Sequence, residues 1–528
     1  MKNILIRSTL VWLAGGLVLA QGPPSKVEVY ESTAKDVSKT LPEMVKSVVT
    51  VGAPAQEKFL GRIPFTGSEN GIQKPDPVLQ PGTLPSMSVT TGAGFAGLGL
   101  GFPGFTLQYA PPDTNASVGD DQIVQWVNAA FAVFNKATHA SLGVFPGNAP
   151  WAGFGGGCQN NNDGDPIVLW DKQAHRWVFT QFSVSTKPYL QCFAISTGTS
   201  ALGPYNRFAF SFGNTDFPDY PKMGVWPDSS NNAYLMSFNI FRNGFFFSGP
   251  RACAVDRAKA LAGLAPIMIC FQLGSSNGTL MASDQDGAAL PPANSPGYFL
   301  AYGTNSLKLW QIRPNFVNFS SSTLTGPSTI NVASFSRACS GGACIPQPGT
   351  SQKLDSLADR LMYRLAYRNF TGSGAHESLV VNHSVTPGNG ASSGIRWYEL
   401  RKSGTGAFSL FQQGTFSPDT TSRWMGSAAM DKNGNIVVGY SASSSSVFPE
   451  IRVAAHCATA TLGQLAAEAI IQTGAGSQLP SLSRWGDYSS LSVDPSDDTT
   501  LWYTTEYLTQ NGTFNWSTRI VPVTANCP

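Results

Sequence analysis

The segment YSSLSVDPSDDTTLWYT at residues 488–504 contains the pattern that decides the predicted fold. A short apolar strand ends in Asp494, a polar turn follows, and a second apolar strand begins near Leu501. An aspartate in this place bonds its own backbone two residues on, which is the chemistry of a tight hairpin. The same arrangement recurs in GDPIVLWDKQAHRWVFTQF (164–182), PKMGVWPDSSNNAYLMSF (221–238) and MGSAAMDKNGNIVVGY (425–440).

The aspartates that end these strands are regularly spaced. Asp171 and Asp228 lie 57 residues apart, and Asp431 and Asp494 lie 63 residues apart. A repeat of about 40–65 residues built on hairpins is typical of a β-propeller. We therefore predict an all-β fold, a six-bladed β-propeller, with a seven-bladed one as the alternative. Two sandwiches with unrelated hairpins are the competing architecture.

Weaker copies of the unit are expected elsewhere in the chain. Between the second and third aspartates lie YFLAYGTNSLKLWQI (298–312) and LMYRLAYRNFTGSGAHESLVVNHSV (361–385), where Tyr367 takes the place of the aspartate. IVQWVNAAFAVFNK (123–136) is a further candidate. Alternating apolar residues favour a strand at 361–368, and leucines at helical spacing leave a helix just before it as an alternative.

The composition excludes several classes of protein. The 528-residue chain has a net charge of +2, and 12% of its residues are charged, roughly half the usual share. Its 54 glycines, together with many Ser, Thr and Asn, indicate short strands joined by polar turns. Nucleic-acid binding is not expected, because no cluster of Lys and Arg forms a basic stripe.

The N-terminus has the three parts of a secretory signal. Lys2 and Arg7 are basic, residues 8–20 are mostly apolar, and small residues precede a cleavage point before Gln21. We expect a secreted, periplasmic or cell-surface protein with no membrane span after cleavage; a retained anchor is the alternative. The predicted domains are a signal peptide at 1–20, a Pro/Gly-rich N-terminal extension at 21–112 and the propeller at 113–528.

Eight cysteines indicate disulfide bonds, because an even number is typical of exported chains with disulfides. Sequence proximity favours the pairs Cys158–Cys192, Cys253–Cys270, Cys339–Cys344 and Cys457–Cys527. Other pairings stay open, since sequence alone does not fix the connectivity.

The run SVDPSDDTTLWYT resembles the Asp-box, the Ser-x-Asp-x-Gly-x-Thr-Trp hairpin of sialidase-like β-propellers. Ser492, Asp494 and Trp502 match in type, whereas the turn is three residues longer and the glycine is missing. The turn AMDKNGN keeps Asp431 and Gly434. The chain is also similar to secreted bacterial propeller-like proteins of uncharacterised function that carry GDPIVLWD-like and RWGDYSSLSVDP-like runs.

This resemblance implies the parts of a sialidase-type site: an arginine cluster for a carboxylate, a tyrosine nucleophile activated by a glutamate, and an acidic aspartate. The matching candidates are Arg364, Arg396, Arg423 and Arg484 for the cluster, Tyr488 with Glu377 or Glu506 for the nucleophile, and Asp165 or Asp487 for the acid. The family's early Phe/Tyr-Arg-Ile-Pro motif is faintly echoed by GRIP at 61–64, within the extension.

Arg-Trp pairs are candidates for a ligand-binding funnel. Arg423-Trp424 and Arg484-Trp485 open two repeat units, near the expected central tunnel. Arginine binds carboxylates, and tryptophan offers a flat apolar face. The predicted ligand-binding residues are Arg364, Arg396, Arg423, Trp424, Arg484 and Trp485. The alternative is that these tryptophans pack between blades and the arginines bridge strands.

Acidic turns are candidate calcium sites. NNNDGD (160–165), DQDG (284–287) and DKNGN (431–435) place several oxygen side chains close together, and calcium prefers such ligands. The candidate ligands are Asp163, Asp165, Asp284 and Asp286. A tight turn without metal is the alternative, and no other cofactor is indicated.

Two functions follow from these patterns. The first is a monomeric secreted propeller that binds an extracellular glycan or a surface protein. The second is a sialidase-like glycoside hydrolase acting on extracellular polysaccharide. They differ in whether carboxylates and arginines converge in the central funnel, so whether the chain is an enzyme stays open.

Overall fold

The computed structural model describes residues 26–45, 55–58, 61–64, 75–80, 84, 86 and 89–527. Nearly all elements in these ranges are strands, which confirms the all-β class. The predicted signal peptide and its cleavage point lie outside the described residues. Within the described ranges, no helix has the length and apolar character needed to cross a membrane.

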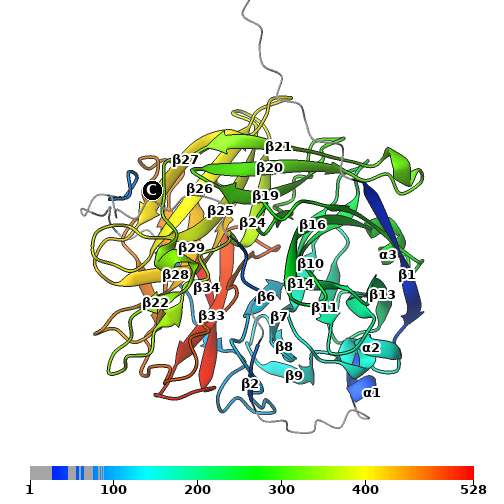
Figure 1. Cartoon of the computed structure of the whole chain (residues 1–528), viewed down its shortest axis with the longest axis horizontal. Coiled ribbons are helices and arrows are strands. Elements are labelled where there is room, and N and C mark those ends of the chain that lie inside the picture. Colours follow the sequence, from blue (N-terminus) through cyan, green and yellow to red (C-terminus); the bar gives the residue numbers. More distant parts are fainter. Residues whose placement is uncertain are drawn as a thin grey trace, which may run out of the picture.

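Most strands belong to antiparallel meanders, in which each strand pairs with the next one along the chain (Figure 1). Seven meanders occur within the described residues. They consist of β6 (Asn115–Val118), β7 (Gln122–Val127), β8 (Ala130–Asn135) and β9 (Ser141–Pro146); β10 (Ile167–Asp171), β11 (Arg176–Ser183), β12 (Tyr189–Ser196) and β13 (Tyr205–Gly213); β14 (Asp216–Trp226), β15 (Ala233–Arg242), β16 (Phe246–Asp256) and β17 (Ile267–Gln272); β18 (Met281–Asp286), β19 (Gly297–Gly303), β20 (Ser306–Arg313) and β21 (Thr323–Asn331); β24 (Met362–Phe370), β25 (His376–Val385), β26 (Gly394–Lys402) and β27 (Ser409–Phe416); β28 (Ser422–Met430), β29 (Ile436–Ser443), β30 (Glu450–His456) and β31 (Ala469–Gln472); and β32 (Ser490–Val493), β33 (Thr500–Leu508) and β34 (Trp516–Ala525).

The first strands of the meanders contact one another in a closed cycle. β6 contacts β10, β10 contacts β14, and the cycle continues through β18, β24, β28 and β32 back to β6. β18 and β24 pair in parallel, with Ser283 opposite Leu365. The sheets therefore surround a common centre, which Figure 1 shows end-on, and the arrangement is propeller-like.

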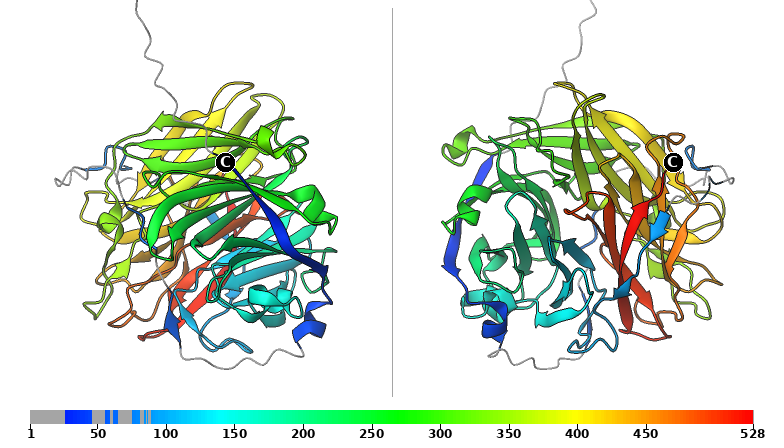
Figure 2. Two further views of the ribbon diagram at one scale, coloured as in Figure 1. Left: turned by 45° about the vertical axis from the view of Figure 1, so that its right-hand side comes forward. Right: turned by 180° about the vertical axis from the view of Figure 1, so that it is seen from behind.

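Strands from the predicted extension add to these sheets. β1 (Val27–Val37) pairs with both β13 and β17 and lies along the outer edge of the molecule (Figure 2). β3 (Val89–Thr91) and β4 (Phe95–Ala96) pair with β34 of the last meander. The remaining short elements are α1 (Leu41–Val45), β2 (Gln56–Glu57), β5 (Tyr109–Ala110), η1 (Ala149–Trp151), α2 (Gly156–Asn160), α3 (Arg257–Leu261), η2 (Phe319–Ser321), η3 (Ala338–Gly341), β22 (Ala343–Ile345) and β23 (Leu354–Asp355).

The aspartates of the predicted repeat lie at the hairpins between first and second strands. The Asp431 carboxylate accepts a hydrogen bond from the Asn433 backbone N–H at 2.8 Å. The Asp494 carboxylate accepts from the Ser496 backbone N–H at 2.9 Å and from the Trp502 indole N–H at 3.0 Å. Each aspartate thus satisfies turn amides that would otherwise be left without a partner, which explains why the residue recurs.

The weaker copies of the repeat are hairpins as well; the one at 361–385 is in phase with the strong copies, and the other two are out of phase. Residues 298–312 fall in β19 and β20, and residues 123–136 fall in β7 and β8, which are second and third strands. Residues 361–368 lie mostly in β24, as predicted, and the segment just before it contains β23 rather than a helix.

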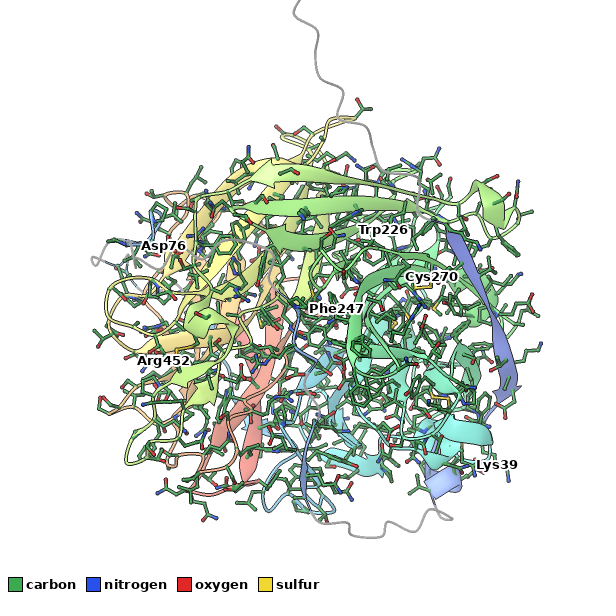
Figure 3. All side chains as sticks on the ribbon, viewed as in Figure 1. Lys39, Asp76, Trp226, Phe247, Cys270 and Arg452 are labelled. Atoms are coloured by element: carbon green, nitrogen blue, oxygen red, sulfur yellow. A yellow bond between two sulfur atoms is a disulfide. The ribbon has the colours of Figure 1, made fainter. Side chains whose placement is uncertain are left out.

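All four predicted disulfides are present: Cys158–Cys192, Cys253–Cys270, Cys339–Cys344 and Cys457–Cys527. Cys253 and Cys270 lie directly opposite each other on β16 and β17, and Figure 3 labels Cys270 there. Four disulfides fit an exported protein, because oxidising compartments are where such bonds persist.

Aromatic side chains fill the space between the sheets. The rings of Trp424 and Trp485 lie 5.9 Å apart, and both side chains are fully buried. At roughly 25 cal/mol per Å², burying a tryptophan of about 200 Å² contributes about 5 kcal/mol. First strands such as β10 and β28 are buried along their whole length, which explains their nearly continuous apolar sequence.

Candidate functional site

Ionisable side chains gather near the start of several first strands, at one end of the axis that these strands surround, which is packed with side chains and which we call the central channel. We call them the mouth cluster, and none is more than 6% exposed. It consists of Asp113, Asp165, Asp219, Tyr220, Lys222, Asp359, Arg360, Arg484, Asp487, Tyr488 and Glu506. Burying so many charges is unfavourable unless they are paired, so the cluster requires a physical explanation.

The backbone brings these side chains together through unusual conformations. Asp113, Asp165 and Tyr220 have φ values of 52°, 47° and 54°, in the left-handed region that non-glycine residues seldom adopt. The Asp165 carboxylate accepts the Tyr220 N–H at 3.2 Å, and the Asp113 carboxylate accepts the Asp487 N–H at 3.0 Å. Carboxylate-to-backbone bonds therefore tie neighbouring meanders together at the mouth.

Ion pairs neutralise part of the charge. Arg484 pairs with Asp487, and the Arg360 Nε donates to Asp359 Oδ1 at 2.7 Å. Three buried atoms have no hydrogen-bond partner among the described residues, namely Arg360 Nη1, Arg484 Nε and Glu506 Oε1. These three atoms of the mouth cluster can therefore still form hydrogen bonds.

Lys222 occupies an aromatic cage in the same cluster. Its ammonium lies 3.6 Å from the ring centre of Tyr220 and 3.9 Å from that of Tyr488, within cation–π range. The Tyr488 hydroxyl donates to the Pro166 carbonyl at 3.0 Å. Burial, which disfavours the charged form, lowers the pKa of Lys222 to about 8.

Burial acts in the opposite direction on the carboxyl groups. It raises the pKa of Asp219 to about 8, with the charge of Asp165 adding to the effect. It also raises the pKa of Glu506 well above its ordinary value, with Asp113 contributing. Strongly shifted groups are typical of functional sites, and buried structural networks produce them too. Access to solvent therefore decides which interpretation applies.

The mouth cluster is covered by part of the extension. Residues 61–64 lie at the centre of Figure 1. The Arg360 Nη2 donates to the Gly61 carbonyl at 3.0 Å, and the Asp359 carboxylate accepts the Ile63 N–H at 3.2 Å. The cluster thus binds a segment of the extension through hydrogen bonds.

A second group of ion pairs lies where the first strands end. Arg364 donates to Asp284 at 2.8 Å and to Asp286 at 2.6 Å. These residues line a cavity of about 30 Å³ together with Lys172, whose pKa burial lowers to about 8. A cavity of this size holds about one water molecule or two.

The surface carries a larger and open groove, with a volume of about 410 Å³. Its walls are the loop at 292–298, the end of β20 and the hairpin between β26 and β27. Gln311 and the exposed Arg313 contribute polar groups, and Arg313 donates to the Asn294 carbonyl at 2.5 Å. The volume lies within the roughly 300–1,000 Å³ that is usual for ligand pockets.

Two aromatic rings and a lysine form the floor of this groove. The rings of Tyr298 and Phe408 meet edge to face at 5.0 Å. The Lys402 ammonium donates to Glu377 at 2.7 Å, and the Tyr367 hydroxyl donates to the same carboxylate at 2.8 Å. Burial, together with the neighbouring Glu377 carboxylate, raises the pKa of Tyr367.

The structure brings only some of the sequence-predicted residues together. Asp165, Arg484, Asp487, Tyr488 and Glu506 lie in the mouth cluster. Arg364, Asp284 and Asp286 lie at the other end of the first strands, and Glu377 lies beside the groove.

The remaining predicted arginines are buried and paired elsewhere. Arg423 binds Glu468 at 2.6 Å and Asp419 at 2.9 Å, and Arg396 binds Asp76 at 2.6 Å. Trp424 and Trp485 pack against each other in the core, outside the groove lining. These positions match the packing interpretation of the Arg-Trp pairs, with Arg484 as the exception.

The predicted calcium ligands have protein partners. The Asp163 carboxylate accepts the backbone N–H groups of Val184 and Ser185 at 2.6 and 2.8 Å. In the part of the chain that is described, no three His, Cys, Asp or Glu side chains are arranged to hold a metal ion. Calcium binding stays a prediction.

Sequence reasoning missed six members of the mouth cluster, namely Asp113, Asp219, Tyr220, Lys222, Asp359 and Arg360. Asp165 and Asp487 come just before the first strands β10 and β32, whereas Asp219 and Lys222 lie inside β14, at an irregularity in its pairing with β15. The sequence around Asp219 and Lys222 therefore carried no comparable signal. The groove had no signal, because its walls come from loops of two different meanders.

No protein-family model matches the chain, and no curated protein matches it. Similar solved structures include the N-terminal domain of Nup159, with 11% identity and a TM-score of 0.35, covering 90% of this chain and 100% of that one. The Hadza microbial sialidase Hz136 has 11% identity and a TM-score of 0.36, covering 78% of this chain and 74% of that one. An exo-β-1,3-galactanase from Clostridium thermocellum has 10% identity and a TM-score of 0.31, covering 79% of this chain and 81% of that one. At such low identities and TM-scores, these likenesses assign the chain neither a family nor an activity.

Proposed function

We propose that this protein is a secreted β-propeller that binds an extracellular glycan in the surface groove. One observation carries the proposal: the open groove and the carboxylates of the mouth cluster are in different places. The described residues that line the groove include no Asp or Glu, whereas the carboxylates of the mouth cluster are buried beneath residues 61–64. Glycoside hydrolysis ordinarily needs two carboxyl groups beside the bond that breaks. Binding is therefore the function that the groove supports.

The lining favours an acidic oligosaccharide. Arg313 is exposed, so its guanidinium faces a ligand in the groove, whereas the Lys402 ammonium in the same lining is paired with Glu377. A guanidinium group forms paired hydrogen bonds with carboxylate or sulfate oxygens. Gln311 and Thr405 offer hydrogen bonds to hydroxyl groups, and Phe408 offers an apolar surface.

Calorimetric titration with uronic-acid-containing, sulfated and neutral oligosaccharides of equal length tests this function. We expect the acidic ligands to bind and the neutral ones to bind more weakly. Arg313→Ala should weaken binding about tenfold, equivalent to about 1.4 kcal/mol. Arg242→Ala is the matched control, because Arg242 is exposed on β15 and outside the groove lining. Unchanged affinity in Arg313→Ala would overturn the assignment of the groove.

A sialidase-like hydrolase is the second candidate function, because part of the predicted catalytic set does converge. Asp165, Asp487, Tyr488 and Glu506 lie in one cluster, and the raised pKa of Glu506 suits a general acid. Release of reducing sugar from the same oligosaccharides tests it. Turnover that Tyr488→Phe and Glu506→Gln abolish would establish the hydrolase in place of the binder.

We further propose that each of the seven meanders is one blade, so that the propeller has seven blades rather than six. The closed cycle of first strands supports this count. Export as a monomer beginning at Gln21 is part of the same proposal, and the four disulfides support the export. The intact mass of the secreted chain tests the start at Gln21, and size-exclusion chromatography tests the monomeric state.

A further inference from the structure

The extension forms a strap over the mouth cluster, and we use that word for residues 55–58 and 61–64. Its first part pairs in parallel with β5, and the two short strands form a two-stranded sheet of their own. The Gln56 N–H donates to the Gln108 carbonyl at 2.8 Å, and the Lys58 N–H donates to the Ala110 carbonyl at 2.8 Å. Extended peptides bind proteins through main-chain hydrogen bonds of this kind.

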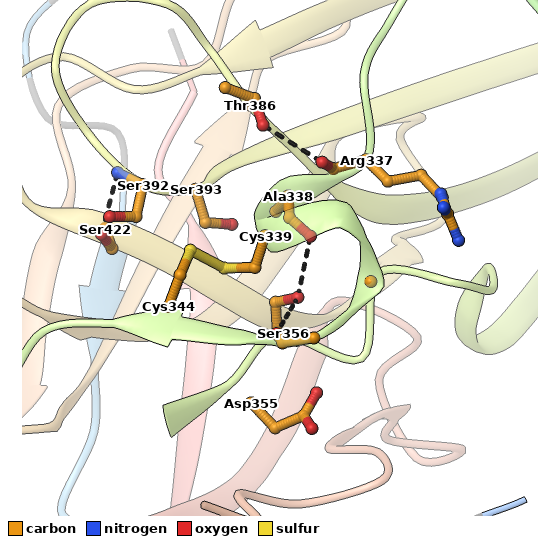
Figure 4. Close-up of a disulfide and its surroundings, with 12 residues drawn as sticks. Arg337, Ala338, Cys339, Cys344, Asp355, Ser356, Thr386, Ser392, Ser393 and Ser422 are labelled. Atoms are coloured by element: carbon orange, nitrogen blue, oxygen red, sulfur yellow. Dashed lines mark hydrogen bonds between the residues drawn. A yellow bond between two sulfur atoms is a disulfide. The ribbon is translucent and has the colours of Figure 1, made fainter. Parts of the chain in front are cut away.

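Two basic side chains of the strap have separate sites on the body. The Lys58 ammonium donates to the Asp163 carbonyl and lies 4.0 Å from the centre of the Tyr109 ring. Arg62 forms an ion pair with Asp355 and donates to the Gly341 carbonyl at 2.5 Å. Asp355 lies beside the loop that the Cys339–Cys344 disulfide closes, as Figure 4 shows.

The mouth cluster itself binds the strap through the backbone. The Arg484 Nη1 donates to the Lys58 carbonyl at 2.7 Å, and the Arg360 Nη2 donates to the Gly61 carbonyl at 3.0 Å. Neighbouring side chains also limit the size of residue 61, the last of the three residues between Lys58 and Arg62. A Cβ on Gly61 would lie 2.5 Å from the Phe241 ring and 2.6 Å from the Asp219 carboxylate, so only glycine fits there without displacement.

We propose that the mouth of the channel is a binding site for an extended basic peptide of the order Lys-x-x-Gly-Arg, which the strap occupies in the free protein. A partner protein that carries such a segment competes with the strap for the same contacts. Because the strap is tethered, its effective concentration is high, and a partner binds only when its peptide is tight enough or the strap is weakened. This site is separate from the groove and does not depend on glycan binding.

The test uses the full chain with a weakened strap. In Lys58→Glu/Arg62→Glu, acidic side chains replace the two basic ones, so the Asp163 and Gly341 carbonyls no longer bind them and the Asp355 carboxylate repels the strap. The probe is a fluorescent peptide of sequence AQEKFLGRIP, which is residues 55–64, and fluorescence anisotropy measures its binding. We expect the double variant to bind this peptide at least about tenfold more tightly than the wild-type chain does.

Matched controls keep the result specific. Lys39→Glu/Arg242→Glu makes the same change of charge at exposed positions away from the mouth, and Figure 3 labels Lys39 at the edge of the molecule. A peptide with both basic residues changed to Glu, or with Gly61→Val, should not bind. If the double variant does not fold, Arg62→Glu alone replaces it, because the Arg62 side chain is 47% exposed.

Two results would overturn the proposal. One is a folded strap variant that binds the wild-type peptide no more tightly than the control variant does. The other is equal binding of the wild-type and charge-reversed peptides. Neither result depends on the oligosaccharide titration, so this proposal and the groove proposal fail independently.

Discussion

The central channel and the surface groove treat charge in opposite ways. The channel collects aspartates, a glutamate, lysines and arginines, buries them and covers its mouth with residues 61–64. The groove leaves Arg313 exposed, pairs Lys402 with Glu377 beside it, and has no Asp or Glu among its described lining residues. Charged residues with strongly shifted pKa values thus lie where the sheets are held together. The accessible site is formed by loops without such residues. Access, rather than charge, separates the two regions.

The sharpest test of this contrast is the loss of one buried arginine in the channel. Arg364→Ala leaves Asp284 and Asp286 buried without their cation, so we expect the free energy of unfolding to fall by about 3–5 kcal/mol. Differential scanning calorimetry measures the effect as a lower Tm. Arg313→Ala, the groove counterpart, should change the free energy of unfolding by no more than about 0.5 kcal/mol. Equal Tm values for both variants would remove the distinction between the regions.

The pH dependence of stability provides a second test. Because burial raises the pKa of Asp219 to about 8, the native state holds this proton more tightly than the unfolded chain does. The wild-type chain should therefore lose stability relative to Asp219→Asn as the pH rises from about 4 to 8, by up to about 1.4 kcal/mol per pH unit.

Urea unfolding at pH 5, 6, 7 and 8 measures this difference. We expect it to grow toward pH 8 and to level off above it, where the wild-type carboxyl is ionised in both states. A difference that stays constant across this range would show that Asp219 is already ionised in the folded protein at pH 5.

The smallest expected effect concerns the polar wall of the groove. Gln311→Ala removes one hydrogen-bonding side chain from an accessible site, so oligosaccharide affinity should fall only about three- to tenfold, equivalent to about 0.5–1.5 kcal/mol. Stability should not change. Calorimetric titration checks the affinity, and a loss of Tm would instead identify Gln311 as a structural residue.

The sequence predicted those parts of the fold that depend on local chemistry. The hairpins at Asp431 and Asp494 were visible because each carboxylate bonds amides two residues away. The disulfides followed proximity because pairs such as Cys253 and Cys270 lie on adjacent strands. The first strand β18 was overlooked, since its polar sequence MASDQD is buried through ion pairs with Arg364 rather than through apolar contacts. The unit was recognised instead from residues 298–312, which form its second and third strands β19 and β20.

The candidate site was predicted less completely, because pairing depends on contacts far apart in sequence. Arg423 and Arg484 precede matched tryptophans, yet Arg423 binds Glu468 whereas Arg484 reaches the mouth and binds Asp487. Nothing in the dipeptide distinguishes these roles. Lys222 gave no signal either, since its aromatic cage contains Tyr488, which is far away along the chain.

Hydrogen–deuterium exchange with the best-binding acidic oligosaccharide tests most directly that ligands bind in the groove and not in the channel. We predict that the ligand slows exchange at residues 292–298, 311–313 and 402–408, and leaves residues 355–360 and 484–488 unchanged. Slower exchange at 355–360 and 484–488, with no change in the groove segments, would contradict the account.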